Sequence, residues 1–537
     1  MCVIQKKKTF NTTGLCVPSK HYMVNTADKI AEIRKLVDSG KYFVINRARQ
    51  YGKTTTLSLL AGDLSANYIV VRLDFQNLGS ASFQTEDEFV RAFSRLILDQ
   101  IEFRGLQMAK DHADGFRSLV GLPENKAQLD ELFRTIRRWC GTSEKPIVLM
   151  IDEVDSATNN QVFLDFLAQL RQAYLEREEC PNVRTFQSVI LAGVTDVKHL
   201  RSRIREEDQH KVNSPWNIAA DFNVDMSLST EGILGMINEY ENDHHTGMDV
   251  SAMAGLIHDY TSGYPYLVSR ICQTIDAKVP EIVGGLEAAW TKVGFDEAIK
   301  EILKEKNTLF DSLIGKLTNY PDIKVCLRRI LMEGEQVSFN LDNDAILQMR
   351  DYGFIKEEAG KIVIANRIFE TRLYNYFLTE EELGNNQIYR EGSLAKNMFV
   401  KDGMLDVRLI LERFVITYGQ VFGPLKDRFP EKDGRELFLL YLRPIINGTG
   451  NYYIEAQTRD QTRTDVIVDY LGKQYVIEMK VWRGPKYNEE GEAQIKGYLD
   501  YYHLTEGYML SFNFNKKKTV GIKCMQVGDK VVYEATL

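Results

Sequence analysis

Residues 46–57, NRARQYGKTTTL, restrict the possible folds of this chain more than any other stretch. They contain Gly52-Lys53-Thr54, the end of the phosphate-binding consensus G-x-x-x-x-G-K-[ST], although Arg47 stands where its first glycine is expected. The preceding run, KYFVIN, predicts a strand, and the following run, TTTLSLLAGDL, has apolar residues at helical spacing. Strand, loop and helix are the setting that this consensus requires, so we expect an α/β domain.

The missing glycine leaves the chemistry of such a loop intact. Backbone N–H groups at a helix N-terminus hold phosphate and need no particular side chain. Lys53 would contact the β- and γ-phosphates of ATP, and Thr54 would be a ligand of Mg²⁺. Arg47 puts only the first turn of the loop in question, because it has a Cβ that glycine lacks. The predicted nucleotide-binding residues of the loop are Arg49, Gly52, Lys53, Thr54 and Thr55.

Residues 1–280 alternate continuous apolar runs with helical segments, which predicts a parallel sheet covered on both faces. A chain of 537 residues is too long for one hydrophobic core, so further domains follow. The expected strands of the first domain are YFVIN, YIVVRLDF, IVLMID, SVILAGV and, as the weakest candidate, FNVDMSL.

The order helix, helix, short hairpin, helix characterises residues 281–380, which resemble a winged helix. A helical connector with a two-stranded patch is an equally weighted alternative. Residues 381–400 are polar and contain glycine and asparagine, so we expect a linker. Residues 401–537 predict amphipathic helices, a strand-rich core, a further helix and final strands.

Composition excludes several classes of protein. No apolar run approaches the length of a membrane span, and the N-terminus MCVIQKKKTF has no apolar signal region. The seven cysteines are scattered without a C-x-x-C pair, which indicates reduced thiols rather than a disulfide framework or zinc site. We therefore expect a cytoplasmic protein without a membrane partner. The net charge of −8 excludes a wholly basic nucleic-acid binder but allows a local basic groove.

Acidic residues that complete the first site follow the run PIVLMIDEVDSA. Asp152 at the end of a buried strand suits a Mg²⁺ ligand, and Glu153 suits a base that polarises the attacking water. Thr195, after the strand SVILAGV, could orient that water or sense the γ-phosphate. Pro265, in the turn before a helix that carries Arg270, could lie against the adenine. Arg201, Arg203 and Arg205 are candidate arginine fingers, although a solvated helix face is the commoner explanation for such arginines.

Because of these residues, positions 1–280 resemble the AAA-ATPase-like family, which is related to archaeal-type and STAND P-loop ATPases. Its R-x-R-x-x-G-K-[ST] loop matches Arg47, Arg49, Gly52, Lys53 and Thr54, so the absent glycine is typical of the family. The resemblance also implies that FNTTGLCVPSKHYMV, near the N-terminus, approaches the base of bound ATP.

A second constellation lies in RTDVIVDYLGKQYVIEMKVW, residues 463–482. Two strand-like runs flank a turn, which predicts a hairpin. Glu478 and Lys480 are two residues apart and share one face of a strand, and the hairpin brings Asp465 towards Glu478. Two carboxylates at that spacing can bind Mg²⁺ through oxygen, and a lysine beside them can orient water or stabilise developing charge. A solvated strand face is the alternative for E-x-K alone.

The conjunction resembles the PD-(D/E)XK nuclease core and covers residues 401–537. Gln494 and Tyr498 lie on one helical face and resemble the Q-x-x-x-Y helix of RecB-type nucleases. Glu436 resembles the first acid of that family, with an exposed helix acid as the common alternative.

Taken together, the sequence predicts an ATPase fused to a nuclease that uses Mg²⁺, or alternatively Mn²⁺. The nuclease is expected to act on nucleic acid, and DNA is the favoured prediction. Two alternatives stay open: a STAND-like switch that uses the nuclease fold for binding, and a remodelling ATPase. A homo-oligomer is compatible with each.

Overall fold

The structure is a computed structural model that divides into two compact units, which are described separately. The first comprises Met1–Asp243 with Asp351–Gly353, and the second comprises His244–Arg350 with Phe354–Leu537. No helix in the described part of the chain combines the length and hydropathy needed to cross a bilayer. The residues described are 7–180, 182–194, 216–332, 335–383, 387–401, 403–422, 433–446, 450–455, 464–471, 473–481, 492, 495–497, 499–500, 504–513 and 518–537.

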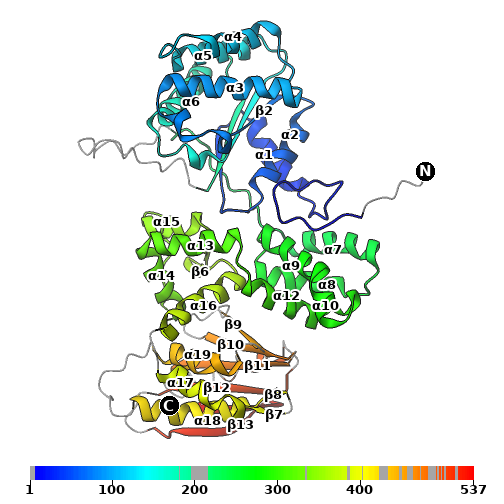
Figure 1. The fold of residues 1–537 in the computed structure, drawn as a ribbon, viewed down its shortest axis with the longest axis vertical. Helices are drawn as coiled ribbons and strands as arrows, with labels where there is room; N and C mark the ends of the chain where they lie inside the picture. Colours follow the sequence, from blue (N-terminus) through cyan, green and yellow to red (C-terminus); the bar gives the residue numbers. More distant parts are fainter. Residues whose placement is uncertain are drawn as a thin grey trace. The chain divides into compact units, whose positions relative to one another are not determined.

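The first unit is built on a four-stranded, wholly parallel sheet with the order β1-β4-β3-β2 (Figure 1). The four strongest strand predictions are confirmed, because each long apolar run forms one strand. β3 and β4 are buried along their whole length, as expected for central strands covered on both faces. The strands are β1 (Phe43–Asn46), β2 (Ile69–Asp74), β3 (Ile147–Asp152) and β4 (Ser188–Gly193).

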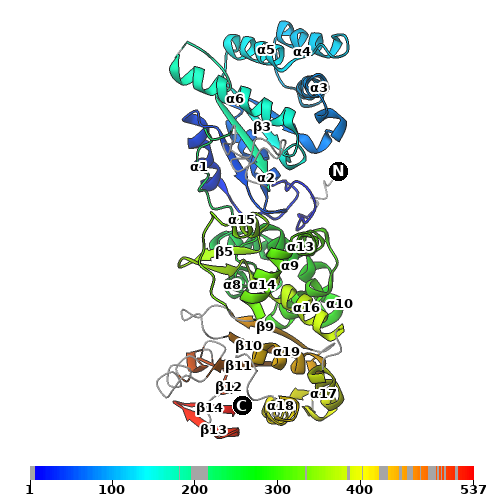
Figure 2. The same cartoon turned by 90° about the vertical axis from the view of Figure 1, so that its left-hand side faces the viewer.

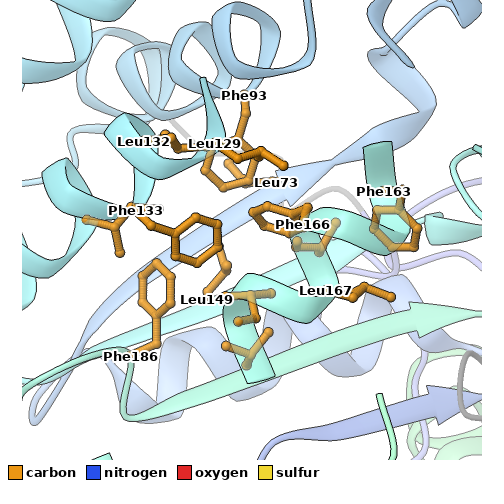
Figure 3. Close-up of a cluster of buried hydrophobic side chains, with 14 of the residues drawn as sticks. Leu73, Phe93, Leu129, Leu132, Phe133, Leu149, Phe163, Phe166, Leu167 and Phe186 are labelled. Atoms are coloured by element: carbon orange, nitrogen blue, oxygen red, sulfur yellow. The ribbon is translucent and has the colours of Figure 1, made fainter. Parts of the chain in front are cut away.

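Helices cover both faces of this sheet, and alternate strand residues belong to two separate cores. Leu73 and Leu149 pack with α3, α5 and α6 in the larger, aromatic-rich core (Figure 3). Val148 and Met150 pack with α1 and α2 in the smaller one. The elements around the sheet are α1 (Ala27–Asp38), α2 (Lys53–Leu64), η1 (Phe75–Asn77), η2 (Ser80–Phe83), α3 (Glu86–Arg104), α4 (Lys110–Gly121), α5 (Leu129–Thr142), η3 (Val154–Ser156) and α6 (Gln161–Glu179).

The fifth expected strand, FNVDMSL at residues 222–228, does not form. The chain makes only an isolated parallel bridge beside β1, between Ala220 and Phe43. The carboxylate of Asp225 accepts hydrogen bonds from the backbone N–H and the hydroxyl of Ser227. Such a local turn competes with strand pairing, which explains why the weakest strand prediction was wrong.

A helical segment begins the second unit and leads to a small hairpin. Beyond α13 the chain forms helix, helix, hairpin and helix, which is the order expected from the sequence. α7 (Thr230–His244) belongs to the first unit except for its last residue. The elements that follow it are α8 (Val250–Thr261), α9 (Pro265–Ala277), α10 (Val279–Val283), α11 (Leu286–Ala289), α12 (Lys292–Lys304), α13 (Thr308–Asn319), α14 (Pro321–Met332), α15 (Asp344–Asp351), β5 (Ile355–Glu358), β6 (Lys361–Ile364) and α16 (Arg367–Leu383).

Residues 381–400, expected to be a linker, carry the packed helix α17 (Gln387–Ala395). Ile388 is buried, and a Cβ on Gly392 would lie 2.2 Å from the carbonyl oxygen of Tyr441 in α19 (Asp433–Ile446). The polar composition therefore reflects one solvated helix face rather than an extended connection. Figure 2 shows α17 and α18 (Val407–Phe422) beside the C-terminal sheet. The short elements η6 (Lys396–Met398), β7 (Val400–Lys401) and β8 (Met404–Leu405) lie between them in the chain.

The C-terminal sheet is six-stranded and mixed, with the order β13-β14-β12-β11-β10-β9. β11 pairs with β12 and β12 with β14 in parallel, and the remaining pairs are antiparallel. Ile495 and Leu499, which are helical and fully buried, lie against Gly507 of β12. The strands are β9 (Gly450–Glu455), β10 (Thr464–Tyr470), β11 (Lys473–Val481), β12 (Glu506–Phe512), β13 (Gly521–Val527) and β14 (Lys530–Thr536).

Candidate nucleotide and metal sites

The loop between β1 and α2 has the backbone of a phosphate-binding loop. Gly52, the residue before α2, has a φ of 83°, a left-handed conformation that glycine adopts without strain. No side chain caps the N-terminus of α2. The N–H groups of the first helical turn therefore suit an anion, in line with the positive end of the helix dipole.

Lys53 is enclosed by this loop. Its ammonium donates hydrogen bonds to the carbonyl oxygens of Arg47, at 3.0 Å, and Ala48, at 3.2 Å. The residue is only 6% exposed, and this burial lowers the pKa of Lys53, while the nearby carboxylates, chiefly Glu153, oppose the shift. The lysine and the loop backbone thus fix each other's position.

Arg47, which replaces the first glycine of the consensus, points towards the segment after β4. Its guanidinium donates a hydrogen bond to the carbonyl of Val224, at 2.8 Å, and lies 5.2 Å from the centre of the Phe222 ring. Its backbone N–H donates to the carbonyl of Gly193 at the end of β4. The long side chain therefore anchors the loop, which accounts for an arginine at this position.

Thr54 and Asp152 lie together, as a shared Mg²⁺ site requires. The Thr54 hydroxyl donates a 2.7 Å hydrogen bond to Asp152 Oδ2, although 98 residues separate the two in sequence. The backbone N–H of Glu153 donates to Asp152 Oδ1. Burial raises the pKa of Asp152, which a bound cation would offset. Both side chains offer the oxygen ligands that Mg²⁺ prefers, so the residues fit the ion.

Glu153 follows β3 in a left-handed conformation, with a φ of 55°. This region is uncommon for a residue with a side chain, and such strain is concentrated at functional sites. Burial raises the pKa of Glu153, whereas Lys53 lowers it. The position after a central strand and beside Lys53 suits a group that polarises water.

The N-terminal segment lies beside the same helix. The backbone N–H of Cys16 donates to the Thr55 hydroxyl at 3.3 Å. Further along, the rings of Phe10, Tyr22 and Tyr240 pack with centroid distances of 5.1–5.3 Å. The segment is thus held at the start of α2. Arg49 is exposed in the turn of the loop.

Asp155 is a residue of this site that the sequence argument missed. Its carboxylate accepts a 2.6 Å hydrogen bond from the backbone N–H of Val194, and a Cβ on Gly193 would lie 3.0 Å from the same oxygen. Asp155 therefore joins the ends of β3 and β4. The spacing of acids in DEVD was the only signal in the sequence.

Other predicted residues of the first site are located elsewhere or lie outside the described residues. Thr195 and the three candidate finger arginines are outside them. Pro265 belongs to the second unit, where it is the first residue of α9. Arg270 pairs with Glu305, which also accepts a 2.8 Å contact from Lys278.

β10 and β11 form the predicted antiparallel hairpin, which carries the residues expected for a second site. Asp465 is directly opposite Glu478 in the register of the two antiparallel strands. Glu478 is fully buried and Lys480 is 2% exposed, so neither belongs to a solvated strand face. The Asp465 side chain, Gln494 and Tyr498 are outside the described residues.

Glu436 lies on α19, where its carboxylate is 2.8 Å from the guanidinium of Arg328 in α14. Its role as the first acid of a nuclease site stays a prediction. Among the side chains that are described, no group of three or more histidines, cysteines, aspartates or glutamates is arranged to hold a metal ion.

Glu534 on β14 is a buried acid that the sequence argument did not select. It lies 3.6 Å from the ammonium of Lys480 and 2.8 Å from that of Lys523. Burial alone would raise the pKa of Glu534, but Lys480, then Lys523 and Ser511, lower it below its ordinary value. The acid within the otherwise apolar run VVYEATL was the available signal.

Comparisons with known proteins identify the family of the part of the chain that contains the first of these sites. The family described as AAA-like domain matches residues 12–379. No curated protein sequence matches the chain. Three solved structures illustrate its structural likenesses. The Walker-type ATPase PABY2304 of Pyrococcus abyssi is 14% identical, with 68% of this chain and 99% of that chain covered and a TM-score of 0.46.

Cdc6p from Pyrobaculum aerophilum is 13% identical, with 66% of this chain and 94% of that chain covered and a TM-score of 0.33. The RuvB Holliday junction branch migration motor of Thermotoga maritima is also 13% identical, with coverages of 63% and 92% and a TM-score of 0.31. The family match spans more than half of the chain and includes every residue of the loop, Asp152 and Glu153. The chain therefore belongs to the AAA-like domain family, and its N-terminal unit is an ATPase module of the P-loop type.

Proposed function

We propose that this AAA-like ATPase is joined to a magnesium-dependent nuclease that cuts DNA. The observation that carries the proposal is the placement of Glu478 and Lys480, side by side and buried, on a strand whose partner holds Asp465 directly opposite Glu478. Residues 380–537, which contain them, lie beyond the part of the chain that matches the family.

Burial of these charges favours a functional explanation over a structural one. Transfer of a carboxylate or an ammonium from water into a protein interior is costly, and a buried ion pair seldom stabilises more than apolar residues of similar size. The alternate face of β11 shows what a structural strand carries, because Ile477 and Met479 are apolar and buried there. Glu478 and Lys480 are buried in spite of that cost.

The residues fit a divalent cation and a phosphodiester. Asp465 and Glu478 would hold Mg²⁺ or Mn²⁺ through carboxylate oxygens, with Glu436 as a further acid. The bound cation would neutralise charge that develops on the phosphate. Lys480 would stabilise the same charge or orient the attacking water. Gln494 and Tyr498 would orient the nucleic-acid strand or the lysine.

The remaining parts suit a DNA-acting machine driven or switched by ATP. Lys53 and the first turn of α2 would hold the phosphates, Thr54 and Asp152 would hold Mg²⁺, and Glu153 would polarise the water. Thr195 would sense the γ-phosphate. The α14–α16 segment with its β5–β6 hairpin would serve as a winged helix that contacts DNA. The basic stretches RGPK (483–486) and NKKKT (515–519) would meet phosphates.

A cleavage assay that crosses ATP with Mg²⁺ on linear, circular and single-stranded DNA tests the proposal. We expect metal-dependent cutting by the parent and none by Asp465→Ala. Asp529→Ala is the matched control, because it removes a carboxylate from an exposed turn of the same sheet. If the parent cuts no DNA or RNA with ATP and either metal, the nuclease proposal fails, and an ATP-dependent switch or remodelling ATPase replaces it.

A further inference from the structure

Glu534 shares a face of the C-terminal sheet with the predicted metal ligand. Glu478 is aligned with Met509 of β12, and Met509 is aligned with Glu534 of β14. Residues that are aligned across neighbouring strands project to the same side of a sheet. Lys480 is aligned with Ser511 and projects to that side too. The second site therefore extends across β12 to β14.

One hydroxyl group and two ammonium groups surround the carboxylate of Glu534. Its Oε1 lies 3.6 Å from Lys480 Nζ and accepts a hydrogen bond from the hydroxyl of Ser511. Its Oε2 lies 2.8 Å from Lys523 Nζ. Because β12 separates β11 from β14, the ammonium of Lys480 reaches across β12 to meet this carboxylate. Both side chains of the Lys480–Glu534 pair are almost completely buried.

We propose that Glu534 is a positioning residue that, with Ser511, holds the ammonium of Lys480 at the nuclease site. The inference rests on the proposed function of that site. Lysine carries its charge on a flexible four-carbon chain, so a fixed partner is needed to keep the ammonium in one place. A reacting group is held by neighbours whose own positions are locked, and the hydroxyl of Ser511 locks Glu534.

The two lysines that meet Glu534 differ in a way that separates their roles. The side chain of Lys523 is 59% exposed, so it competes with water for the carboxylate and contributes little. The side chain of Lys480 is completely buried, so the carboxylate replaces the water that its ammonium has lost. Substitution of Lys523 is therefore a matched control for substitutions that act through Lys480.

Steady-state cleavage by the full chain tests the inference. Glu534→Gln keeps the shape but removes the charge, and we expect kcat to fall about tenfold or more. KM for DNA and the calorimetric affinity for Mg²⁺ should change less than twofold, because no proposed ligand is removed. Lys523→Ala should keep the parent kcat. An unchanged kcat in Glu534→Gln, or an equal loss in Lys523→Ala, overturns the inference.

Ser511→Ala supplies the same test if Glu534→Gln does not fold. It removes one hydrogen bond to Glu534, and we expect kcat to fall about threefold with an unchanged KM. A kcat equal to that of the parent contradicts the role.

A thermal-unfolding cycle tests the Lys480–Glu534 pair without any cleavage. Glu534→Gln should shift the unfolding temperature less in a Lys480→Met background than in the parent, because the buried one of its two ion-pair partners is already absent. Additive shifts overturn the inference. If the parent cuts nothing while the shifts are non-additive, the proposed nuclease fails but Glu534 still holds Lys480.

Discussion

The two candidate sites of this chain are built in opposite ways. At the nucleotide site most of the contacts come from backbone groups. The loop carbonyls of Arg47 and Ala48 hold Lys53, and the first turn of α2 offers N–H groups. At the second site the charges belong to side chains within strands, and Glu478 and Lys480 are buried in the sheet. The first site therefore depends on loop conformation and the second on strand register.

This difference teaches which changes each site tolerates. The loop accepts Arg47 in place of glycine because the guanidinium binds the Val224 carbonyl and leaves the backbone of the loop in place. A shift of β11 by one residue would instead exchange Glu478 and Lys480 for Ile477 and Met479 on the same face. Substitutions at the first turn of the loop should therefore disturb the nucleotide site little, whereas changes that shift the hairpin register should disrupt the second site.

Glu153→Gln should have the largest effect, and it tests whether binding and chemistry are separate at the backbone-built site. The loop and Lys53 stay intact, so ATP affinity should be unchanged, while hydrolysis should fall by about 10³-fold on loss of the base. Phosphate release measures the hydrolysis rate, and calorimetry measures the ATP affinity. Glu144→Gln, at an exposed acid before β3, is the control. Hydrolysis at the parent rate would assign the base to another residue.

Lys480→Ala should lower DNA cleavage by about 10²-fold, the scale of losing a charge-stabilising group. Both carboxylates stay, so Mg²⁺ should still bind in calorimetry. The substitution also removes the buried one of the two ammonium groups that lie beside Glu534, so unfolding should occur at a lower temperature than in the parent. Cleavage and stability equal to the parent would place Lys480 outside the site.

Asp465→Asn tests whether the carboxylate of Asp465 binds the metal ion at the second site. It keeps the shape of the side chain but removes one ligand charge, so Mg²⁺ affinity should fall and high Mn²⁺ should partly restore cleavage.

Lys53→Ala should reduce ATP affinity at least tenfold, or about 1.4 kcal/mol, because it removes the charge that meets the phosphates. Its unfolding temperature should fall less than that of Lys480→Ala, since the hydrogen bonds that it loses go to neutral carbonyl groups, whereas Lys480 pairs with a buried carboxylate. Calorimetric titration measures the affinity. An unchanged affinity would contradict the assignment of the loop.

Asp469→Asn should have the smallest effect, and it extends the comparison to pH. Asp469 is buried on β10, four residues after Asp465, and its Oδ1 has no hydrogen-bond partner among the described residues. Burial, followed by the charge of Asp296, raises the pKa of Asp469 to about 7. The groups that oppose this shift are Lys292, Gln474 and Lys300.

The sign of the pH effect follows from this raised pKa. Between the ordinary pKa of an aspartate and about 7, the folded chain keeps a proton on Asp469 that the unfolded chain releases. The stability of the folded chain therefore falls as the pH rises from the ordinary pKa of an aspartate to about 7. In urea unfolding, Asp469→Asn should be more stable than the parent by about 1 kcal/mol at pH 8, with a smaller difference at pH 5. The role of Asp469 would be refuted if the stability difference between the variant and the parent were equal at the two pH values. It would also be refuted if Asp529→Asn showed the same trend.

Much of the fold was predictable because its signals are local. Continuous apolar runs predicted β1 to β4, and two strand-like runs around a short turn predicted the β10–β11 hairpin. The opposition of Asp465 and Glu478 followed from that hairpin, since the length of a turn sets the register of its strands. Gly52, Lys53 and Thr54 were identifiable for the same reason, as a tripeptide between a strand and a helix.

Two other elements could not be predicted from the local sequence pattern. The run FNVDMSL has the composition of a strand, yet Asp225 binds Ser227 and forms a turn. The polar stretch 381–400 suggested a linker, yet Gly392 lets α17 approach the backbone of α19 closely. Composition cannot tell a solvated helix face from a loop when the partner helix lies some 50 residues further along the chain.

The sequence by itself determined most of the elements, the phosphate-binding loop and the hairpin acids, because each depends on residues that are close in the chain. Only the tertiary structure decided which distant groups meet: Thr54 with Asp152, Arg47 with Val224, and Lys480 with Glu534. Those contacts depend on the order of strands in each sheet. A pattern of spacing cannot specify that order, because it is chosen by the packing of the whole unit.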